Sequence, residues 1–279
     1  MLGLTGEPVV VMSGQRPQVT VVVPTYQEAE NIGSFLRAVR ATLPHACVVV
    51  CDDSSPDGTG TIAERVGFEI GNCQVIYQAG KQGLGNAYRH GFRVALDQDT
   101  DVIVQMDADF SHPHGMLPGM VDRIEAGADV VIGSRYVSGG GTPDWPAHRR
   151  VLSKYGNLYA RHLLRLAVRD ATSGMRAYRA ESLRQIGVDG TRANGYGFML
   201  ETIRRLTVAG LRVEEVPLLF RDRVAGKSKM TVSIMAENLV LVTWWGVSIR
   251  YPRFARTFRT SPAGQYLSDL AARLSFTRV

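Results

Sequence analysis

The chain has 279 residues and a mass of 30.6 kDa, with 45% hydrophobic and 21% charged residues. This composition is typical of a globular protein with a hydrophobic core, and it excludes a disordered chain, a disulfide-stabilised miniprotein and a collagen-like fibre. Five of the six net positive charges arise in residues 250–279, where six Arg oppose one Asp, while the rest of the chain has 26 basic and 25 acidic residues. We therefore expect no nucleic-acid-binding surface.

No segment reaches the roughly 18–20 consecutive apolar residues that span a bilayer, and residues 1–17 lack the pattern of a signal peptide. We therefore interpret residues 1–17 as a flexible extension of a cytoplasmic protein. Cys47 and Cys51 flank a valine run, and Cys73 is the third cysteine. This spacing favours reduced thiols in a buried strand over a disulfide or a zinc site.

Short apolar runs alternate with helical patterns along the chain. Strands are predicted at 19–23, 47–51, 75–77, 102–106 and 129–132, with helices at about 31–43, 84–96 and 116–125 and one more between the second and third strands. A glycine-rich loop at 138–143 then precedes predicted helices at about 148–166 and 198–209, a strand at 211–220 and a basic loop at 221–230. Continuous apolar strands separated by helices predict an α/β fold with a doubly wound, mostly parallel sheet.

Polar residues follow three of these strands. Tyr26-Gln27-Glu28 come after the first strand, Asp52-Asp53 after the second, and Asp107-Ala108-Asp109 after the strand at 102–106. Doubly wound sheets bind ligands at the carboxyl ends of their strands, so we expect these residues to form one site.

Asp107 and Asp109 are two residues apart, so their carboxylates share a face of an extended chain and suit one hard cation, Mg²⁺ or Mn²⁺. The alternative is a solvated turn. Asp52 and Asp53 are predicted to accept hydrogen bonds from a base or ribose, or to cap the following helix.

Arg221, Arg223, Lys227 and Lys229 place four cations in the loop at 221–230. Such a loop can close over a diphosphate and stabilise a leaving group, although a solvated loop is the alternative. His112 and His114 are separated by Pro113, and we expect them to have a loop role.

The segment from Trp244 to Phe258 has a helical pattern. Tyr251, Phe254 and Phe258 fall within about 60° on a helical wheel, and Arg side chains cover the remaining surface. This pattern favours a helix in an anionic membrane interface, or alternatively a helix packed on the domain.

Together these residues resemble the polyprenyl-phosphate mannosyltransferases (dolichol-phosphate mannose synthases), which are inverting glycosyltransferases of the type A fold. The resemblance covers about residues 19–245. Its landmarks are Pro24-Thr25-Tyr26-Gln27-Glu28, Asp52 to Thr59, Lys81 to Gly85, Met106 to Asp109, Gly133 to Tyr136, Trp145 with Arg149 and Ser153, and Gly226 to Lys229. It implies a catalytic domain at 18–230 and a helical membrane-interface tail at 231–279.

The resemblance also implies roles for individual residues. The nucleotide of GDP-mannose is expected at Pro24, Tyr26, Glu28, Asp53 and Ala108, with Arg223 and Lys229 on its phosphates. The divalent cation is expected at Asp107 and Asp109, with Ser111 in the place where some relatives have a third ligand, Gln. The phosphate of the lipid acceptor is expected at Arg135, Arg149 and Ser153.

The implied reaction transfers mannose to a polyprenyl phosphate with inversion. Because the acceptor is already an anion, no general base is required, and Glu201 is not assigned as one. Some relatives have C-terminal transmembrane helices, whereas no segment of this sequence has the pattern of one. We therefore expect a peripheral protein on the cytoplasmic face, with a membrane surface or a separate membrane-anchoring protein as partner. The alternatives are transfer from UDP-glucose or UDP-N-acetylglucosamine, and a catalytically silent scaffold.

Overall fold

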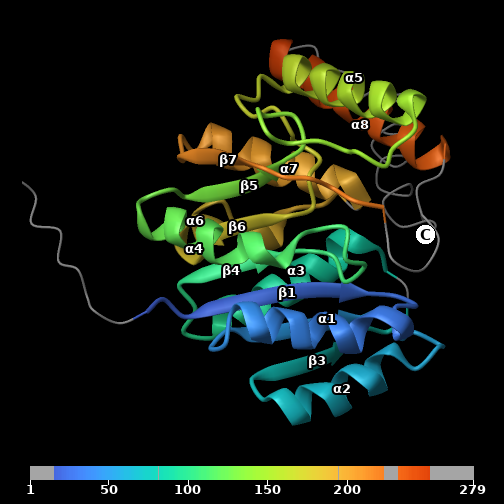
Figure 1. Cartoon of the computed structure of the whole chain (residues 1–279). Helices are drawn as coiled ribbons and strands as arrows, with labels where there is room; N and C mark the ends of the chain where they lie inside the picture. The colour runs from blue at the N-terminus through green and yellow to red at the C-terminus, as the bar shows by residue number, and fades with distance from the viewer. Residues whose placement is uncertain (1–15, 81, 194, 223–231, 252–279) are drawn as a thin grey trace, which may run out of the picture.

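A computed structural model describes residues 16–80, 82–193, 195–222 and 232–251. Arg223 and Lys229, and the tail residues Phe254 and Phe258, lie outside the described residues. Within them, seven strands form one sheet in the order β3-β2-β1-β4-β6-β5-β7, and β6 alone is antiparallel to its neighbours (Figure 1). The predicted doubly wound, mostly parallel α/β fold is confirmed.

The strands are β1 (Val19–Thr25), β2 (Cys47–Asp52), β3 (Cys73–Tyr77), β4 (Val102–Gln105), β5 (Val130–Ser134), β6 (Arg176–Arg179) and β7 (Val213–Pro217). The helices are α1 (Ala29–Thr42), α2 (Thr59–Ile70), α3 (Leu84–Asp97), α4 (Leu117–Glu125), α5 (Ala147–Leu164), α6 (Ala180–Gln185), α7 (Gly195–Val208) and α8 (Val232–Arg250). Two 3₁₀ helices, η1 (His114–Met116) and η2 (Val188–Gly190), complete the described elements. The sequence does not predict β6, α6, η1 or η2, and α8 begins twelve residues before the helical pattern expected at 244–258. The other elements lie within a few residues of their predicted positions.

Helices cover both faces of the sheet because successive strand residues point to opposite sides. In β1, Val21 and Val23 belong to the core cluster formed with α1, α2 and α4, whereas Val22 belongs to the cluster formed with α3, α6 and α7. On the second face α3 lies very close to the strands: a Cβ at Gly91 would come within 3.0 Å of Val22 and Cys51 side-chain atoms. Cys47, Cys51 and Cys73 are free thiols, as predicted.

Helix α8 packs beside α5 (Figure 1). Tyr159 on α5 and Thr243 on α8 share a hydrogen bond of 2.7 Å between their hydroxyl groups, and Val242 is buried in the core. Helix α8 ends at Arg250, since the residue before Pro252 is restricted from the helical region, so the helix expected over 244–258 does not extend through Tyr251. The described part of the predicted tail therefore packs on the domain, and its contact with a membrane stays a prediction.

Among the described helices, none has the length and apolar character needed to cross a membrane.

Candidate active site

The carboxyl ends of β3, β2, β1 and β4 lie side by side, because these four strands are parallel and adjacent. Gln78, Asp53, Tyr26 and Asp107 follow them in that order. The antiparallel β6 starts at the same edge, since Arg176 pairs with Gln105. The structure thus brings the strand-end residues singled out in the sequence to one edge of the sheet.

Three loops at this edge contain a residue other than glycine in the left-handed region. Gln27 follows β1 with φ of 55°, Ser54 follows β2 with φ of 53°, and Phe110 follows β4 with φ of 60°. Residues with side chains adopt this conformation at a cost, and such strain is concentrated at functional sites. The backbone therefore marks the same three loops as the polar side chains do.

Asp52 and Asp53 have different roles. The buried Asp52 carboxylate accepts hydrogen bonds from the Thr25 hydroxyl (2.8 Å) and from the Ser55 backbone N–H (2.8 Å) and hydroxyl (2.6 Å). These bonds close the loop after β2. Neither aspartate caps α2, so the capping alternative is wrong: Asp57 instead accepts the Thr59 N–H at 3.1 Å.

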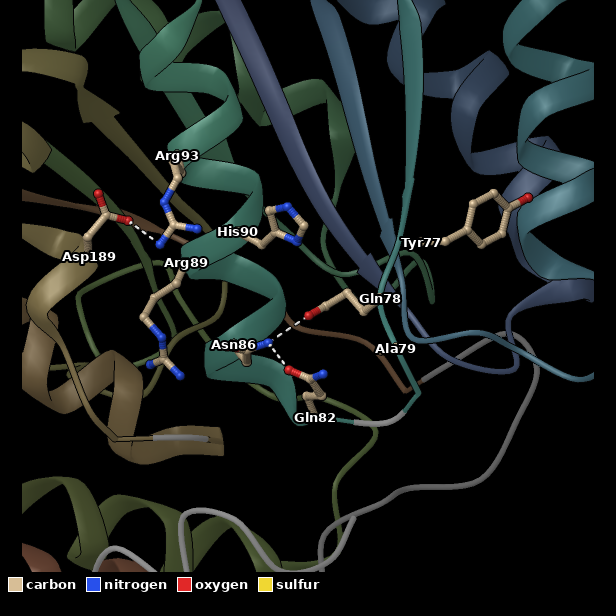
Figure 2. Close-up of a pocket in the computed structure, with 9 residues that line it drawn as sticks. All are labelled: Tyr77, Gln78, Ala79, Gln82, Asn86, Arg89, His90, Arg93 and Asp189. Atoms are coloured by element: carbon tan, nitrogen blue, oxygen red, sulfur yellow. Dashed lines mark hydrogen bonds and ion pairs between the residues drawn. The ribbon is translucent and has the colours of Figure 1, made fainter.

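Asp53 is held by a chain of two side-chain amides, Gln78 and Asn86, which Figure 2 shows hydrogen-bonded to each other. Gln78 Nε2 donates to Asp53 Oδ1 at 2.7 Å, and Asn86 Nδ2 on α3 donates to Gln78 Oε1 at 2.6 Å. Gln78 is 6% exposed and lines a pocket of about 300 Å³ between the end of β3 and α3. The side chain of the preceding residue, Tyr77, points away from the hydrogen-bonded amides of Gln78 and Asn86. The amide chain therefore fixes one oxygen of a carboxylate that lies at the site edge.

The other residues expected to hold the nucleotide lie at the end of β1. Pro24 and Tyr26 are half-buried there, and Glu28 is the residue from which α1 starts. The Glu28 N–H donates to Thr59 Oγ1 at 2.9 Å, which ties this loop to α2. Ala108, which lies between Asp107 and Asp109 after β4, is buried.

Asp107 and Asp109 are both positioned by neighbouring groups. The fully buried Tyr88, stacked on Phe198, donates its hydroxyl to Asp107 Oδ1 at 3.1 Å. Asp109 Oδ1 accepts both the Ser111 N–H (3.1 Å) and its hydroxyl (2.6 Å). Ser111 therefore orients Asp109 in this structure.

His112 supports the same turn. Burial lowers the pKa of His112 below its ordinary value despite the nearby Asp107 and Asp109 charges, which favours the uncharged ring near neutral pH. Its Nδ1 accepts the Asp107 backbone N–H at 3.4 Å, which agrees with the loop role expected for this histidine. A Cβ at Gly174 would lie 3.3 Å from both Asp107 Oδ2 and His112 Cε1, so glycine keeps this side of the carboxylate uncrowded.

The two carboxylates suit a hard divalent cation, because Mg²⁺ and Mn²⁺ prefer oxygen ligands and leave positions for phosphate oxygens. The lack of a side chain at Gly174 leaves Asp107 Oδ2 uncrowded, which also suits binding of a cation. In the part of the chain that the structure describes, no group of three or more His, Cys, Asp or Glu side chains forms a metal site.

Arg135 lies on the other side of the site, in a buried ion pair with Asp170. Its Nε and Nη2 each donate to an Asp170 oxygen at 2.7 Å, and its backbone N–H donates to Asp170 Oδ2 at 3.0 Å. The guanidinium also lies 5.6 Å from the centre of a Trp145 ring, over which Arg149 stacks at 3.9 Å. Trp145 therefore brings together two of the residues expected at the acceptor phosphate.

Arg149 and Ser153 lie one turn apart on α5. Arg149 forms a half-exposed ion pair with Asp222 at 3.0 Å. Ser153 Oγ accepts the Tyr136 hydroxyl proton at 2.7 Å. All three predicted acceptor residues are therefore linked to the strand end after β5, through Trp145 or Tyr136.

Phe220 connects the two halves of the site. Its ring centre lies 5.5 Å from His112, 5.4 Å from Trp145 and 5.8 Å from the Arg135 guanidinium. The next residue, Arg221, donates its N–H to the Ser111 carbonyl at 3.3 Å. The segment that leads to residues 223–231 therefore passes directly beside Asp109 and its partner Ser111.

Glu201 is engaged elsewhere. Its Oε2 accepts the backbone N–H groups of Arg192 (2.8 Å) and Ala193 (2.9 Å), and its Oε1 pairs with Arg205 at 2.8 Å. These contacts agree with the expectation that Glu201 is not a general base, and they assign it to the support of the 191–193 loop.

The sequence alone did not single out Gln78, Tyr88, Asp170, Gly174 or Phe220. Gln78 directly follows a predicted strand, so the rule applied to the other strand ends would have found it. The other four lie in segments without a distinctive pattern, and only their contacts reveal their roles.

The sheet order and the polar residues at its carboxyl edge are typical of the α/β fold of nucleotide-sugar transferases. Comparison with known proteins supports this class. Residues 20–187 match the family described as Glycosyl transferase family 2. The chain is 42% identical over 234 residues to an undecaprenyl-phosphate mannosyltransferase of Micrococcus luteus, covering 84% of this chain and 96% of that protein. It is 40% identical over 252 residues to a polyprenol monophosphomannose synthase of Mycolicibacterium smegmatis, covering 90% and 94%.

Among solved structures, a mannosyltransferase from Pyrobaculum calidifontis in complex with GDP-Man and Mn²⁺ has the same fold. The TM-score is 0.56 at 19% identity, with 94% of this chain and 73% of that chain covered. The chain belongs to glycosyl transferase family 2, and the resemblance to polyprenyl-phosphate mannosyltransferases is confirmed.

Proposed function

We propose that this protein transfers mannose from GDP-mannose to a polyprenyl phosphate with inversion, giving a β-mannosyl phosphoryl polyprenol. One structural observation carries the proposal. One edge of the sheet contains the carboxylates at the ends of β2 and β4 and the two arginines, Arg135 and Arg149, that contact Trp145. Phe220 lies between the β4 end and this arginine pair. The names of the two relatives at 40–42% identity support this substrate class.

On the donor side, we assign the guanosine to the loops after β1 and β2. Pro24, Tyr26 and Glu28 would border it, together with the backbone of Ala108. Asp53 would accept hydrogen bonds from the base or ribose, and the amides of Gln78 and Asn86 would keep its carboxylate in one orientation. A carboxylate that is already oriented loses less entropy when it binds a ligand.

Asp107 and Asp109 would hold a divalent cation, Mg²⁺ or Mn²⁺, and Ser111 would act by orienting Asp109. When bound, such a cation neutralises charge on the diphosphate. Arg223 and Lys229 stay predicted as phosphate contacts, and the segment before them starts beside Ser111.

On the acceptor side, Arg149 would make the main contact with the phosphate. Its present partner Asp222 is 49% exposed, so an incoming phosphate can replace this carboxylate at modest cost. Arg135 is already paired with Asp170, so it would act on the acceptor phosphate mainly through its fixed positive charge and less through a new bidentate contact. Ser153 lies one turn from Arg149 and would offer its hydroxyl to the same anion.

The reaction then depends on alignment and on leaving-group stabilisation. A phosphate oxygen of the acceptor forms a bond to the anomeric carbon, while the bond from that carbon to the GDP oxygen breaks with its electron pair. GDP leaves on the opposite face, so the configuration inverts. No proton must be removed from the acceptor, in agreement with the engagement of Glu201 in its own loop.

We also infer that the protein works at the cytoplasmic face of a membrane, where its lipid acceptor resides. A separate membrane-anchoring protein stays a prediction.

Transfer of labelled sugar to polyprenyl phosphate tests the proposal. We expect metal-dependent labelling of lipid from GDP-mannose, and loss of labelling in Asp109→Asn with folding retained. Arg149→Ala should raise the KM for the lipid phosphate and leave GDP binding almost unchanged. Labelling from UDP-glucose or UDP-N-acetylglucosamine instead would overturn the donor, and a folded protein that binds no GDP in the presence of metal would support the scaffold alternative.

A further inference from the structure

The ion pair of Arg149 and Asp222 lies where the acceptor phosphate is proposed to bind. Arg149 Nη1 donates to Asp222 Oδ1 at 3.0 Å, and the two side chains are 39% and 49% exposed. Carboxylate and phosphate oxygens accept hydrogen bonds from the same guanidinium donors. The Asp222 carboxylate therefore occupies a donor of Arg149 that an incoming phosphate would use.

The backbone of Asp222 is held independently of this ion pair. The Asp222 N–H donates to Asp144 Oδ2 at 3.4 Å, and the N–H of the preceding Arg221 donates to the Ser111 carbonyl at 3.3 Å. Both bonds use only main-chain atoms of residues 221 and 222. The Asp222 side chain can therefore leave Arg149 by rotation about its own bonds, while its backbone keeps these contacts.

Arg149 is also held independently of the pair. Its guanidinium stacks on the buried Trp145 ring, at 3.9 Å from the ring centre, and this cation–π contact does not involve Asp222. The half-exposed Asp222 carboxylate is hydrated by water once it is released. One anion can therefore replace the other on Arg149 without leaving a buried charge unpaired.

The charge of the acceptor phosphate changes in the proposed reaction. A phosphate monoester carries about two negative charges near pH 7, because its second pKa is about 6. The oxygen that bonds to the anomeric carbon loses its charge, and the GDP oxygen that leaves with the bonding electron pair gains one. The lipid product is therefore a singly charged diester. Its attraction to Arg149 is weaker than that of the acceptor, whereas the attraction of Asp222 is unchanged.

We propose that Asp222 is an internal competitor for the acceptor phosphate. Its carboxylate pairs with Arg149 in the free protein, is displaced by the doubly charged acceptor, and pairs with Arg149 again as the singly charged product dissociates. The inference rests on the proposed function, because it requires a phosphate acceptor at Arg149. Such a competitor lowers the affinity for every anion at this position by one common factor, since only the unpaired form of Arg149 binds an anion.

Steady-state transfer of mannose from GDP-mannose to detergent-dispersed polyprenyl phosphate tests this inference in the full chain. Inorganic phosphate and the purified mannosylated lipid serve as inhibitors that compete with the acceptor. The variant Asp222→Asn keeps the shape of the side chain and removes its charge. The matched control Asp189→Asn removes the same charge from an ion pair with Arg93 at 3.1 Å, in which the side chains are 53% and 51% exposed. Circular dichroism checks that both variants fold.

We expect Asp222→Asn to lower three constants by a common factor of about three to five, as the loss of an exposed ion pair allows. These constants are the KM for polyprenyl phosphate and the inhibition constants of inorganic phosphate and of the lipid product. The KM for GDP-mannose should stay unchanged, and the control should behave as the wild type does. A rise in the three constants would show that Asp222 positions Arg149 for the phosphate, and it would overturn the inference. Unchanged constants would overturn it as well.

A double-mutant cycle tests whether Asp222 acts through Arg149. In the Arg149→Ala background, Asp222→Asn should lose most of its effect on inhibition by inorganic phosphate. The full effect in that background, or an equal effect of Asp189→Asn, would indicate a general change in charge and refute the inference. Failure of the proposed function is distinguishable, because the wild type itself would then transfer no mannose to the lipid phosphate.

Discussion

The ion pair of Arg135 and Asp170 lies deep in the structure, where a missing partner is costly. The side chains are 8% and 0% exposed, and Asp170 accepts three N–H groups of Arg135. Asp170→Asn keeps the shape of the side chain and removes its charge, so the buried guanidinium loses the carboxylate with which it forms this ion pair. Breaking a buried pair in this way costs about 3–5 kcal/mol of unfolding free energy.

Urea denaturation followed by circular dichroism measures this loss. Glu69→Gln is the matched control, because it removes the charge of a carboxylate that faces Arg37 at the surface, with side chains 54% and 45% exposed for Arg37 and Glu69. We expect the control to lose about 0–1 kcal/mol. If Asp170→Asn lost no more than the control, the buried pair would not have the structural role assigned to it.

The pH dependence gives a second check on the same pair. Burial alone raises the pKa of Asp170, but the charge and hydrogen bonds of Arg135 outweigh burial and hold the pKa below its ordinary value. A carboxyl group with a lowered folded-state pKa stabilises the protein fully above its unfolded pKa of about 3.9, and this contribution is lost as the pH falls through the folded-state value. The stability difference between wild type and Asp170→Asn should therefore be constant near neutral pH and shrink below about pH 4. A difference that stayed unchanged in acid would contradict this origin.

Three further substitutions test the site and its support. Gln78→Ala removes a hydrogen bond from Asp53 and should raise the KM for GDP-mannose about fivefold with little change in kcat, as measured by steady-state kinetics. Tyr88→Phe removes the hydroxyl bonded to Asp107 and should weaken Mn²⁺ binding in the presence of GDP about fivefold, as measured by calorimetry. Gly91→Ala places a methyl group against β1 and β2 and should lower the unfolding free energy by about 1–3 kcal/mol in urea denaturation.

Each substitution has a control of the same chemical type. Gln98→Ala removes an exposed hydrogen bond between the side-chain amides of Gln98 and Gln74, and it should leave the KM for GDP-mannose unchanged. Tyr178→Phe removes an equally buried hydroxyl, bonded to Gln105, and should leave Mn²⁺ binding unchanged. Gly156→Ala adds a methyl group in open space on α5 and should stabilise the protein by about 0.5–1 kcal/mol. A variant that behaved like its control would refute the contact from which its prediction was made.

The sheet and the donor side of the site were predictable because they depend on local patterns. The runs at Val19 and Cys47 are apolar on both faces of the sheet, as parallel strands covered by helices require. Once such a sheet is assumed, parallel neighbours place Asp53 and Asp107 at one edge. The side-chain roles were harder to separate: Asp52 and Asp53 are adjacent in sequence, yet one closes a loop and the other joins the amide chain.

The acceptor side was predictable only through the resemblance, because its contacts join distant segments. Arg135 pairs with a residue 35 positions away, and Arg149 with one 73 positions away. The strand β6 has four residues, two of them Arg, and does not resemble a buried strand. Arg176 is nevertheless fully buried, because its guanidinium donates to the backbone carbonyls of Ser173, Met199 and Ala171.

The direction of β6 is what joins the two sides of the site. β6 lies between β4 and β5 and is antiparallel to both, so the segment that precedes it enters at the edge where those strands end. That segment places Gly174 against Asp107 and Asp170 against Arg135. A parallel strand in the same position would enter from the opposite edge, and these residues would lie a full strand length from the carboxylates. The single antiparallel strand therefore gives one short segment contact with both the proposed metal site and the proposed acceptor site.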